Sequence, residues 1–189
     1  MDKTELSTRF TDTMAKFTSY LGKHLPDDVL ARLKEMRTEQ SAPLAKVMFD
    51  SMFKDLELAE RNNVPFCQDT GVIQYWLECG SEFPLIGQMQ ECLREATIRA
   101  TREAPLRHNA VQIFDEKNTG NNTGVRIPWI DWDIVPGSDQ CVVHGYMAGG
   151  GCSLPGTAKV LMPVEGYEGI VRYVFDTICD RGVNACPPL

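Results

Sequence analysis

The sequence predicts an α+β fold, in which a helical N-terminal layer is followed by a mixed sheet with flanking helices. Apolar side chains recur every three or four positions along residues 3–59, which is typical of amphipathic helices. Short apolar or alternating runs bounded by glycine, proline and asparagine then follow between residues 71 and 148, which is typical of strands. Helices that precede strands, without regular alternation, favour the α+β class.

Three helices are expected before the first strand. The apolar side chains of residues 3–23 share one face, so this segment is the first expected helix. Pro26 and Asp27 open the second, because proline and an acidic residue suit the first turn of a helix. Pro43 begins a third helix that continues towards Ala59.

The remaining elements follow from the same two periodicities. Strands are expected at "GVIQYWLECG", "AVQIF", "WIDWDIV" and "QCVVHGYMA", which are residues 71–80, 110–114, 129–135 and 140–148. Helices are expected at about residues 85–103 and 168–179. The alternation in "WIDWDIV" predicts a half-exposed strand with Asp131 and Asp133 on a solvated face. No repeat or interdomain linker is visible, so residues 1–189 are expected to belong to one domain.

The composition excludes several classes of function. The chain has 189 residues, of which 43% are apolar and 24% charged, as in ordinary globular proteins. Its net charge of −7 argues against nucleic acid or an anionic membrane as the main partner, since both select for clustered lysine and arginine. No apolar run approaches the ~20 residues of a membrane helix, and "MDKTELSTRF" lacks the apolar core of a signal peptide. We therefore expect a cytoplasmic protein.

Two of the seven cysteines have unusual surroundings. The cysteines are odd in number, widely spread and without a CxxC pair, so neither a disulfide framework nor a compact zinc site is predicted. Cys67 lies in "PFCQDTGV", directly before an amide and a carboxylate, Gln68 and Asp69. Cys186 lies in "NACPPL", and a proline after a ligating cysteine is common in iron–sulfur proteins. Both cysteines are candidate metal ligands.

Three further motifs leave alternatives open. "GGGCSLPGTAK" resembles a phosphate loop, but Thr157 stands where its lysine belongs, so a flexible turn is the competing interpretation. "NTGNNTG" offers backbone amides to an anion, although a solvated loop is favoured. "PLRHNA" places Arg107 after a helix end, where its side chain either grips a carboxylate with two hydrogen bonds or lies on the surface without a ligand.

The motifs "CQDTG", "PLRHNA", "NTGNNTG", "LMPVEGYEGIVRYVFD" and "NACPP" occur in the order seen in the class I iron–sulfur hydro-lyases, which include fumarases and tartrate dehydratases. The sequence resembles this family from about residue 10 to its end. Fumarases of the class usually carry "KGGGSEN" in the glycine loop, whereas this loop, "AGGGCSLPG", is similar to that of the tartrate-dehydrating members. The resemblance implies the alpha subunit of a hydro-lyase that acts on tartrate, with fumarate as the alternative substrate.

The resemblance also implies an iron–sulfur cofactor. Members of the family hold a [4Fe–4S] cluster with three cysteines, and Cys67 and Cys186 match two of them. The third lies in a segment that family members carry beyond the position of Leu189. The chain is therefore expected to be the N-terminal part of the catalytic domain, cut before the third cysteine. Alone, it is expected to fold but to be cluster-free and inactive.

Around the cluster, the resemblance implies a site for a small dicarboxylate. Gln68 and Asp69 match substrate contacts, and Asp69 is a candidate for proton transfer. Arg107 matches a clamp on a substrate carboxylate, and Gly150 a backbone contact. A beta subunit is the implied partner, and apolar surface left uncovered favours self-association into a homo-oligomer. A folded module without catalytic activity is the remaining alternative.

Overall fold

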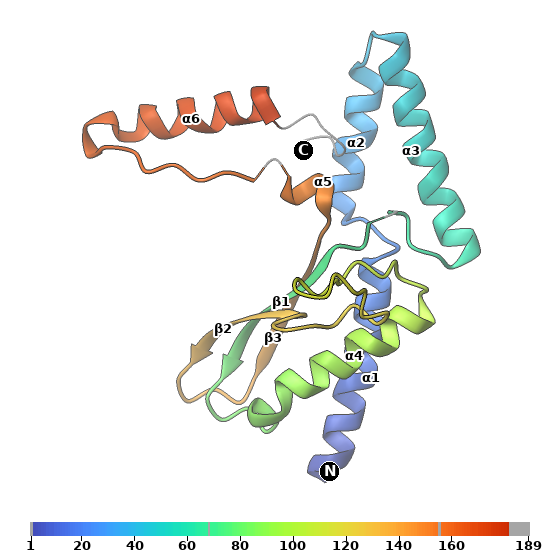
Figure 1. Cartoon of the computed structure of the whole chain (residues 1–189), viewed down its shortest axis with the longest axis vertical. Helices are drawn as coiled ribbons and strands as arrows, with labels where there is room; N and C mark the ends of the chain where they lie inside the picture. The colour runs from blue at the N-terminus through green and yellow to red at the C-terminus, as the bar shows by residue number, and fades with distance from the viewer. Residues whose placement is uncertain (1, 68, 155, 182–189) are drawn as a thin grey trace. The chain divides into compact units, whose positions relative to one another are not determined.

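The computed structural model describes residues 2–67, 69–154 and 156–181 of the chain (Figure 1). These residues fall into two compact units, divided between Met147 and Ala148. Helices and a mixed sheet make up an α+β fold, as the sequence predicts. The first unit contains the sheet and its covering helices, and the second contains the glycine loop and a long helix.

The predicted N-terminal helices are confirmed as α1 (Lys3–Leu21), α2 (Asp27–Glu39) and α3 (Pro43–Asn62). Asn63 ends α3 in the left-handed conformation, with a φ of 54°, and its amide donates to the carbonyl of Glu60 (3.2 Å). α2 and α3 run antiparallel (Figure 1), and an ion pair between Arg37 and Asp50 joins them.

Three strands form one sheet in the order β2-β1-β3: β1 (Val72–Gly80), β2 (Trp129–Val135) and β3 (Cys141–Ala148). β1 and β2 run parallel, with Gly80 opposite Val135. β3 runs antiparallel to β1, because the amides of Gly80 and Glu82 donate to the carbonyls of Gln140 (2.7 Å) and Ser138 (2.9 Å) respectively. The sheet is therefore mixed, and three of the four predicted strands are present.

One face of β1 forms the centre of the core. Alternate side chains of β1 are almost completely buried, namely Ile73, Tyr75, Leu77 and Cys79. They pack with apolar residues of α1 and of α4 (Met89–Glu103), two helices that lie side by side (Figure 1). A short 3₁₀ turn, η1 (Ile86–Gln88), leads directly into α4, so the helix expected at residues 85–103 is confirmed.

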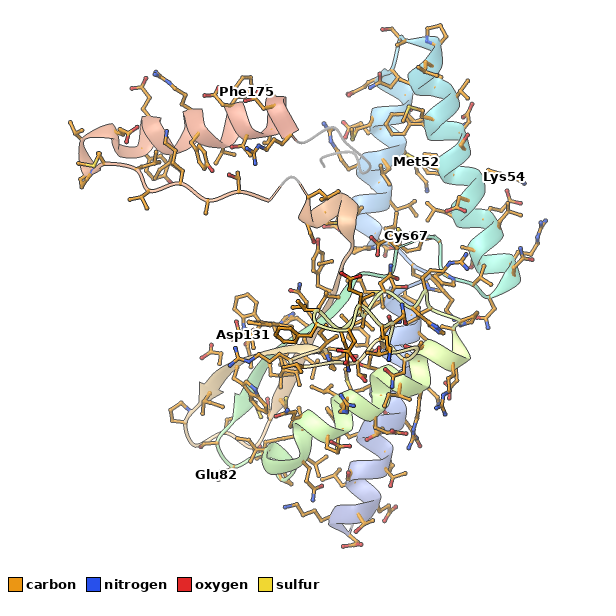
Figure 2. All side chains as sticks on the ribbon, in the orientation of Figure 1. Met52, Lys54, Cys67, Glu82, Asp131 and Phe175 are labelled. Carbon is orange, nitrogen blue, oxygen red and sulfur yellow. The ribbon has the colours of Figure 1, made fainter. Side chains whose placement is uncertain are left out.

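The opposite face of the sheet is exposed in the described part of the chain. Trp76 of β1 and Trp129 of β2 are 58% and 48% exposed. Asp131 and Asp133 of β2 are exposed as well, which confirms the predicted solvated face (Figure 2). The core of the first unit therefore lies on one side of the sheet only.

The strand expected at residues 110–114 is not formed. Val111 makes only an isolated bridge to Asn118. Ile113 and Phe114 are 87% and 99% exposed, so the apolar residues that favoured a strand are not packed within the described structure. An apolar run becomes a strand only when a neighbour takes up its backbone hydrogen bonds, and here the pairing ends after one bridge.

The second unit begins with the glycine loop. Its elements are the single turn α5 (Gly150–Ser153), the 3₁₀ turn η2 (Pro163–Glu165) and α6 (Gly166–Arg181), and α6 confirms the helix expected at residues 168–179. The apolar side chains of α6 are exposed within this unit, and Phe175 is 65% exposed (Figure 2). None of the described helices combines the length and the apolar character needed to cross a membrane.

Tyr75 places a hydroxyl in the core and should make the fold sensitive to high pH. Its Oη is hydrogen bonded with the hydroxyls of Thr18 and Thr97. Burial raises the pKa of Tyr75, so the folded state resists an ionisation that the unfolded chain undergoes near pH 10. The stability contributed by the neutral phenol is therefore complete below about pH 10 and is lost as the pH rises further.

We expect Tyr75→Phe to lower the free energy of unfolding at neutral pH by about 1 kcal/mol, because it removes the buried hydroxyl that bonds with Thr18 and Thr97. The variant should also lose less stability than the wild type above about pH 10. Some of the decline should remain, since the pKa of Cys141 is raised too. Denaturant unfolding at several pH values measures this, with Tyr20→Phe as the exposed control. Parallel declines in Tyr75→Phe and the wild type would contradict the assignment.

Candidate active site

Cys67 lies on the connection between α3 and β1 (Figure 2). Two backbone hydrogen bonds fix the start of this connection: Val64 N–H to the carbonyl of Ala59 (3.0 Å), and Phe66 N–H to the carbonyl of Gly22 (3.2 Å). The thiol of Cys67 is exposed, and its Sγ accepts a hydrogen bond from the amide of Asp69 (3.5 Å). The connection therefore presents this thiol to solvent on an anchored backbone.

Asp69 shapes the turn that leads into β1. Its Oδ1 accepts a hydrogen bond from the amide of Gly71 (2.9 Å), two residues further along the chain, so the side chain forms an Asx turn. Gly71 has a φ of 69°, a conformation that favours glycine. Asp69 is half-buried. The sequence predicted a site role for this carboxylate, and the structure adds a role in fixing the backbone beside Cys67.

Thr70 joins this turn to the segment that carries Arg107. The buried Thr70 donates its amide hydrogen to Oδ1 of Asn109 (3.2 Å). Its Oγ1 accepts a hydrogen bond from the amide of Arg107 (2.9 Å). These two bonds link residues 37 and 39 positions apart, so the motifs "CQDTG" and "PLRHNA" lie against each other.

Asn122 holds the same segment from the opposite side. Its Oδ1 accepts from the amide of Asn109 (2.9 Å), and its Nδ2 donates to the carbonyl of Arg107 (2.8 Å) and to Oγ1 of Thr101 (3.3 Å). Asn122 is only 1% exposed and has a φ of 56°. Asparagine tolerates this left-handed conformation better than most residues. The third motif, "NTGNNTG", therefore packs onto the other two.

This packing corrects the favoured interpretation of "NTGNNTG" as a solvated loop for its second half, whereas Asn118 and Gly120 are exposed as expected. Asn122 and Thr123 are both almost completely buried. The loop stays polar because the side-chain amide of Asn122 replaces water as a partner for the backbone of Arg107 and Asn109. Thr70, Asn109 and Asn122 are thus positioning residues that the sequence prediction did not single out, although each lies within a motif that it quoted.

Arg107 combines a fixed backbone with an exposed side chain. Its amide and carbonyl are both hydrogen bonded, to Thr70 and Asn122, and the preceding Leu106 is buried. Within the described ranges, the guanidinium makes no ion pair with a carboxylate. An anchored arginine without an internal counter-ion suits the binding of a carboxylate by two hydrogen bonds.

The structure brings together some of the predicted residues. Cys67, Asp69 and Arg107 belong to segments joined through Thr70. Gly150 opens α5 in the second unit, and the structure places it only within that unit. The predicted ligand Cys186 and the predicted contact Gln68 lie outside the described residues. Within the described ranges, no group of three His, Cys, Asp or Glu side chains could hold a metal ion.

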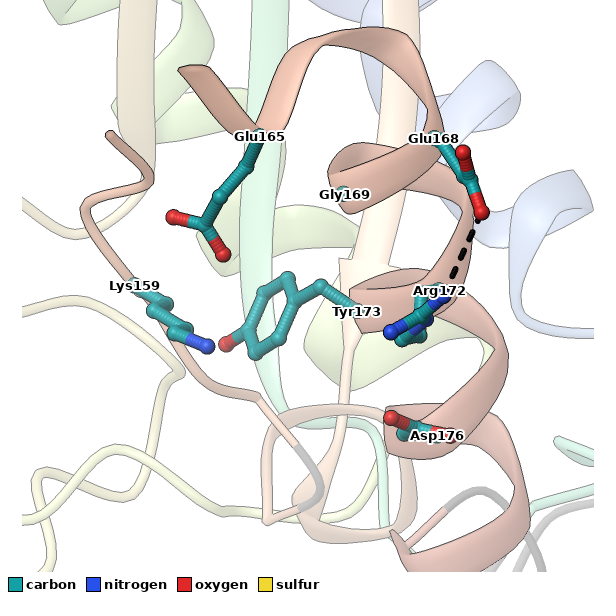
Figure 3. Close-up of a pocket in the computed structure, with 7 residues that line it drawn as sticks. All are labelled: Lys159, Glu165, Glu168, Gly169, Arg172, Tyr173 and Asp176. Carbon is teal, nitrogen blue, oxygen red and sulfur yellow. Dashed lines mark hydrogen bonds and ion pairs between the residues drawn. The ribbon is translucent and has the colours of Figure 1, made fainter. Parts of the chain in front are cut away.

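The second unit has a polar pocket of about 260 Å³ on α6 (Figure 3). Lys159 Nζ lies 5.6 Å from the centre of the Tyr173 ring, and Arg172 pairs with Glu168 one helical turn away (3.2 Å). Every residue of this pocket comes from the second unit, and none of the predicted site residues lines it.

The comparison with family models decides the relationship. The model described as "Fumarate hydratase (Fumerase)" matches residues 11–189. The chain belongs to this fumarate hydratase family. The resemblance inferred from the motifs is thereby confirmed at the level of the family.

Curated relatives align with nearly the whole chain at identities of 29% to 47%. L(+)-tartrate dehydratase subunit alpha of Escherichia coli K12 is 47% identical over 188 residues, which cover 100% of this chain and 62% of the relative. The protein of the same name from Shigella sonnei gives the same values. A putative L(+)-tartrate dehydratase subunit alpha from Methanocaldococcus jannaschii is 29% identical over 184 residues, or 96% of this chain and 65% of the relative. The chain thus spans about three fifths of the length of these relatives.

Asn122 should be essential to the arrangement of the family motifs. We expect Asn122→Ala to lower the free energy of unfolding by about 3 kcal/mol, because it removes the buried hydrogen bonds and places alanine in the left-handed conformation. Asn122→Gly keeps that conformation accessible, so it should recover about 1 kcal/mol of this loss. Chemical denaturation of the three proteins measures both effects. Equal stability of Asn122→Ala and the wild type would show that the network is not energetically important.

Proposed function

We propose that the chain is the N-terminal part of the catalytic alpha subunit of an iron–sulfur hydro-lyase that dehydrates L(+)-tartrate to oxaloacetate. The observation that carries the proposal is the junction of three family motifs through Thr70, Asn109 and Asn122. This junction presents a thiol and a guanidinium on neighbouring, anchored segments. The names of the curated relatives support tartrate as the substrate.

The surroundings of Cys67 fit a ligand of an iron–sulfur cluster. Its thiol is exposed, and the amide of Asp69 donates to its sulfur (3.5 Å), as backbone amides commonly do to the sulfur ligands of clusters. We propose Cys67 and Cys186 as two of three ligands of a [4Fe–4S] cluster, with the third supplied by sequence beyond Leu189. When bound, the cluster would supply an open iron that acts as a Lewis acid on the departing hydroxyl.

The other residues are proposed to orient the substrate. Arg107 binds one carboxylate of the dicarboxylate with its planar fork, while Gln68 and the backbone of Gly150 contact the substrate. Asp69, oriented through its bond to Gly71, is proposed to take part in moving the proton. Loss of a carbon-bound hydrogen and the neighbouring hydroxyl, together as water, turns tartrate into the enol of oxaloacetate, which tautomerises to the keto acid.

Fumarate hydration is the second candidate, because the family model that matches the chain is described as fumarate hydratase. The two reactions use the same kinds of group and differ in the hydroxyls that the substrate carries. The glycine loop "AGGGCSLPG" favours tartrate, since it lacks the lysine and the acid of "KGGGSEN". A folded module without catalytic activity is the alternative from another class.

The proposed setting of the enzyme is the cytoplasm. The name "subunit alpha" carried by the relatives supports a beta subunit as the partner. Exposed apolar side chains, such as those on α6, support a homo-oligomer. The isolated 189-residue chain, with two of the three proposed ligands, is expected to be cluster-free and inactive.

The test is to express the chain with the continuation found in its relatives and with a beta subunit, and to reconstitute iron and sulfide without oxygen. We expect water loss from L(+)-tartrate at a catalytic efficiency at least about tenfold above that for fumarate hydration. Preferential turnover of fumarate would select the second candidate. A full cluster with turnover of neither substrate would favour the non-catalytic module.

A further inference from the structure

We propose that Cys79 and Cys141 are a redox-sensitive pair that closes into a reversible disulfide between β1 and β3. Cys79 is the penultimate residue of β1, and Cys141 is the first residue of β3. The pair belongs entirely to the first unit and is distinct from Cys67. The proposal therefore does not depend on the proposed dehydratase function.

The strand register places the two cysteines directly opposite each other. The amide of Gly80 donates to the carbonyl of Gln140, and the amide of Glu82 donates to the carbonyl of Ser138. A step of two residues forward along the chain on one side therefore matches a step of two residues backward on the other, as in an antiparallel register. By this register, Cys79 faces Cys141. Since Gly80 and Gln140 form a hydrogen-bonded pair, the adjacent pair of cysteines is a non-hydrogen-bonded one.

A non-hydrogen-bonded antiparallel pair has the spacing that a disulfide requires. Its Cα atoms lie about 4.5 Å apart, which falls within the range of about 4.4–6.8 Å seen for disulfides. Both side chains lie on the covered face of the sheet, where Cys79 belongs to the core and Cys141 packs against it. The two thiols are close enough that Cys79 contributes to the raised pKa of Cys141. The bond can therefore close without a rearrangement of the strands.

The unequal burial of the pair assigns a role to each sulfur. Cys79 is 0% exposed, whereas Cys141 is only partly buried and is the sulfur that a small oxidant reaches first. Burial and the neighbouring Cys79 raise the pKa of Cys141 to about 12. At neutral pH nearly all of Cys141 is protonated, so this thiol reacts slowly and responds to sustained oxidation rather than to brief exposure.

A hydroperoxide is an oxidant small enough to reach the partly buried thiol of Cys141. The Cys141 thiolate attacks the peroxide, the O–O bond breaks, and a sulfenic acid forms while an alcohol or water leaves. The sulfur of Cys79 then attacks the sulfenic sulfur, the S–O bond breaks, and hydroxide leaves as water with the proton of Cys79. Two thiols lose two electrons in total, and one peroxide is reduced. A dithiol such as dithiothreitol reduces the disulfide back to two thiols by thiol–disulfide exchange.

The disulfide would close residues 79–141 into a loop that contains α4, β2 and the segments of Arg107 and Asn122. Such a long loop restricts the unfolded chain strongly, so oxidation should raise the thermal midpoint by about 5–10 °C. The pair would thus protect the first unit under oxidising conditions.

The sharpest test is a thiol count in a chain that keeps only three cysteines. In a background with serine at the other four positions, Cys79, Cys92 and Cys141 remain; the positions replaced are Cys67, Cys152, Cys179 and Cys186. Treatment with hydrogen peroxide should lower the count of free thiols from three to one, and dithiothreitol should restore it. In the matched control Cys92→Ser, the number of free thiols should fall from two to none. In Cys141→Ser, it should stay at two.

The same link can be mapped in the wild-type chain, which covers the case of a background variant that fails to fold. After oxidation and alkylation, cleavage at glutamate separates Cys79 from Cys67 and Cys92, because Glu78, Glu82 and Glu91 lie between them. A second cleavage with chymotrypsin after Tyr146 separates Cys141 from Cys152. A linked peptide containing Cys79 and Cys141 is the expected product. The proposal would be overturned if Cys79 were found alkylated while Cys141 was oxidised to a sulfinic or sulfonic acid. A disulfide from either cysteine to a different cysteine would overturn it as well.

Discussion

Cys67→Ser is expected to abolish iron retention by the complete enzyme. The thiol would be one of only three protein ligands, and a serine hydroxyl is a poor replacement for a thiolate on iron. The change should leave the fold intact, because the Cys67 side chain is exposed and the backbone around it is held by bonds of other residues. Iron and sulfide content after anaerobic purification, together with the visible absorbance of the cluster, measures the effect.

The controls for this prediction are cysteines with a packing role. Cys92 is buried and hydrogen bonded with Ser7 (3.2 Å), and Cys79 lies in the core. Serine at either position, or at the exposed Cys179, should leave the iron content at the wild-type level. Full iron retention in Cys67→Ser would show that the cluster ligands have been assigned to the wrong residues.

Arg107→Lys should lower kcat/KM of the complete enzyme by about 30- to 1000-fold, or roughly 2–4 kcal/mol in transition-state binding. An ammonium keeps the charge but cannot reproduce the planar pair of hydrogen bonds to a carboxylate. The backbone should stay in place, since Thr70 and Asn122 bond to the amide and carbonyl of residue 107 and not to its side chain. The loss is therefore expected to be one of catalysis, without a loss of stability.

Steady-state kinetics with tartrate, combined with iron analysis, separates the two possible causes of a weak Arg107→Lys enzyme. Iron content should match the wild type while the rate falls. Arg102→Lys, in the last turn of α4, is the matched control and should keep normal kinetics. Normal efficiency in Arg107→Lys would mean that the arginine has no part in binding the substrate.

Much of the fold was predictable because most elements carry a periodic apolar pattern, which α1, β1 and α4 bury in the core. The helices α1, α4 and α6 and the strands β1 to β3 each carry a periodic apolar pattern that their length makes unambiguous. The failure at residues 110–114 has a physical cause. Apolar residues such as Ile113 and Phe114 favour a strand locally, but the sheet has no partner for them in the described structure.

The site was only partly predictable for a different reason. Motif chemistry identified Cys67, Asp69 and Arg107, whereas the hydrogen bonds that fix their backbones connect residues far apart in sequence. Asn122 shows the difficulty: an asparagine among glycines and threonines has the composition of a solvated turn. Its burial depends on tertiary partners that no local pattern contains.

The parallel pairing of β1 with β2 has a consequence for how the protein folds. Residues 81–128 must cross from the end of one strand to the start of the other before the pairing can form, so the contact order of this part of the sheet is high. The segments of Arg107 and Asn122 lie within that crossover. Arg107 and Asn109 reach Thr70 only as the crossover closes, whereas the partners of Asn122 lie within the crossover itself. The link between the segments of Cys67 and Arg107 should therefore appear late during folding, after α1 and α4 have formed as local helices.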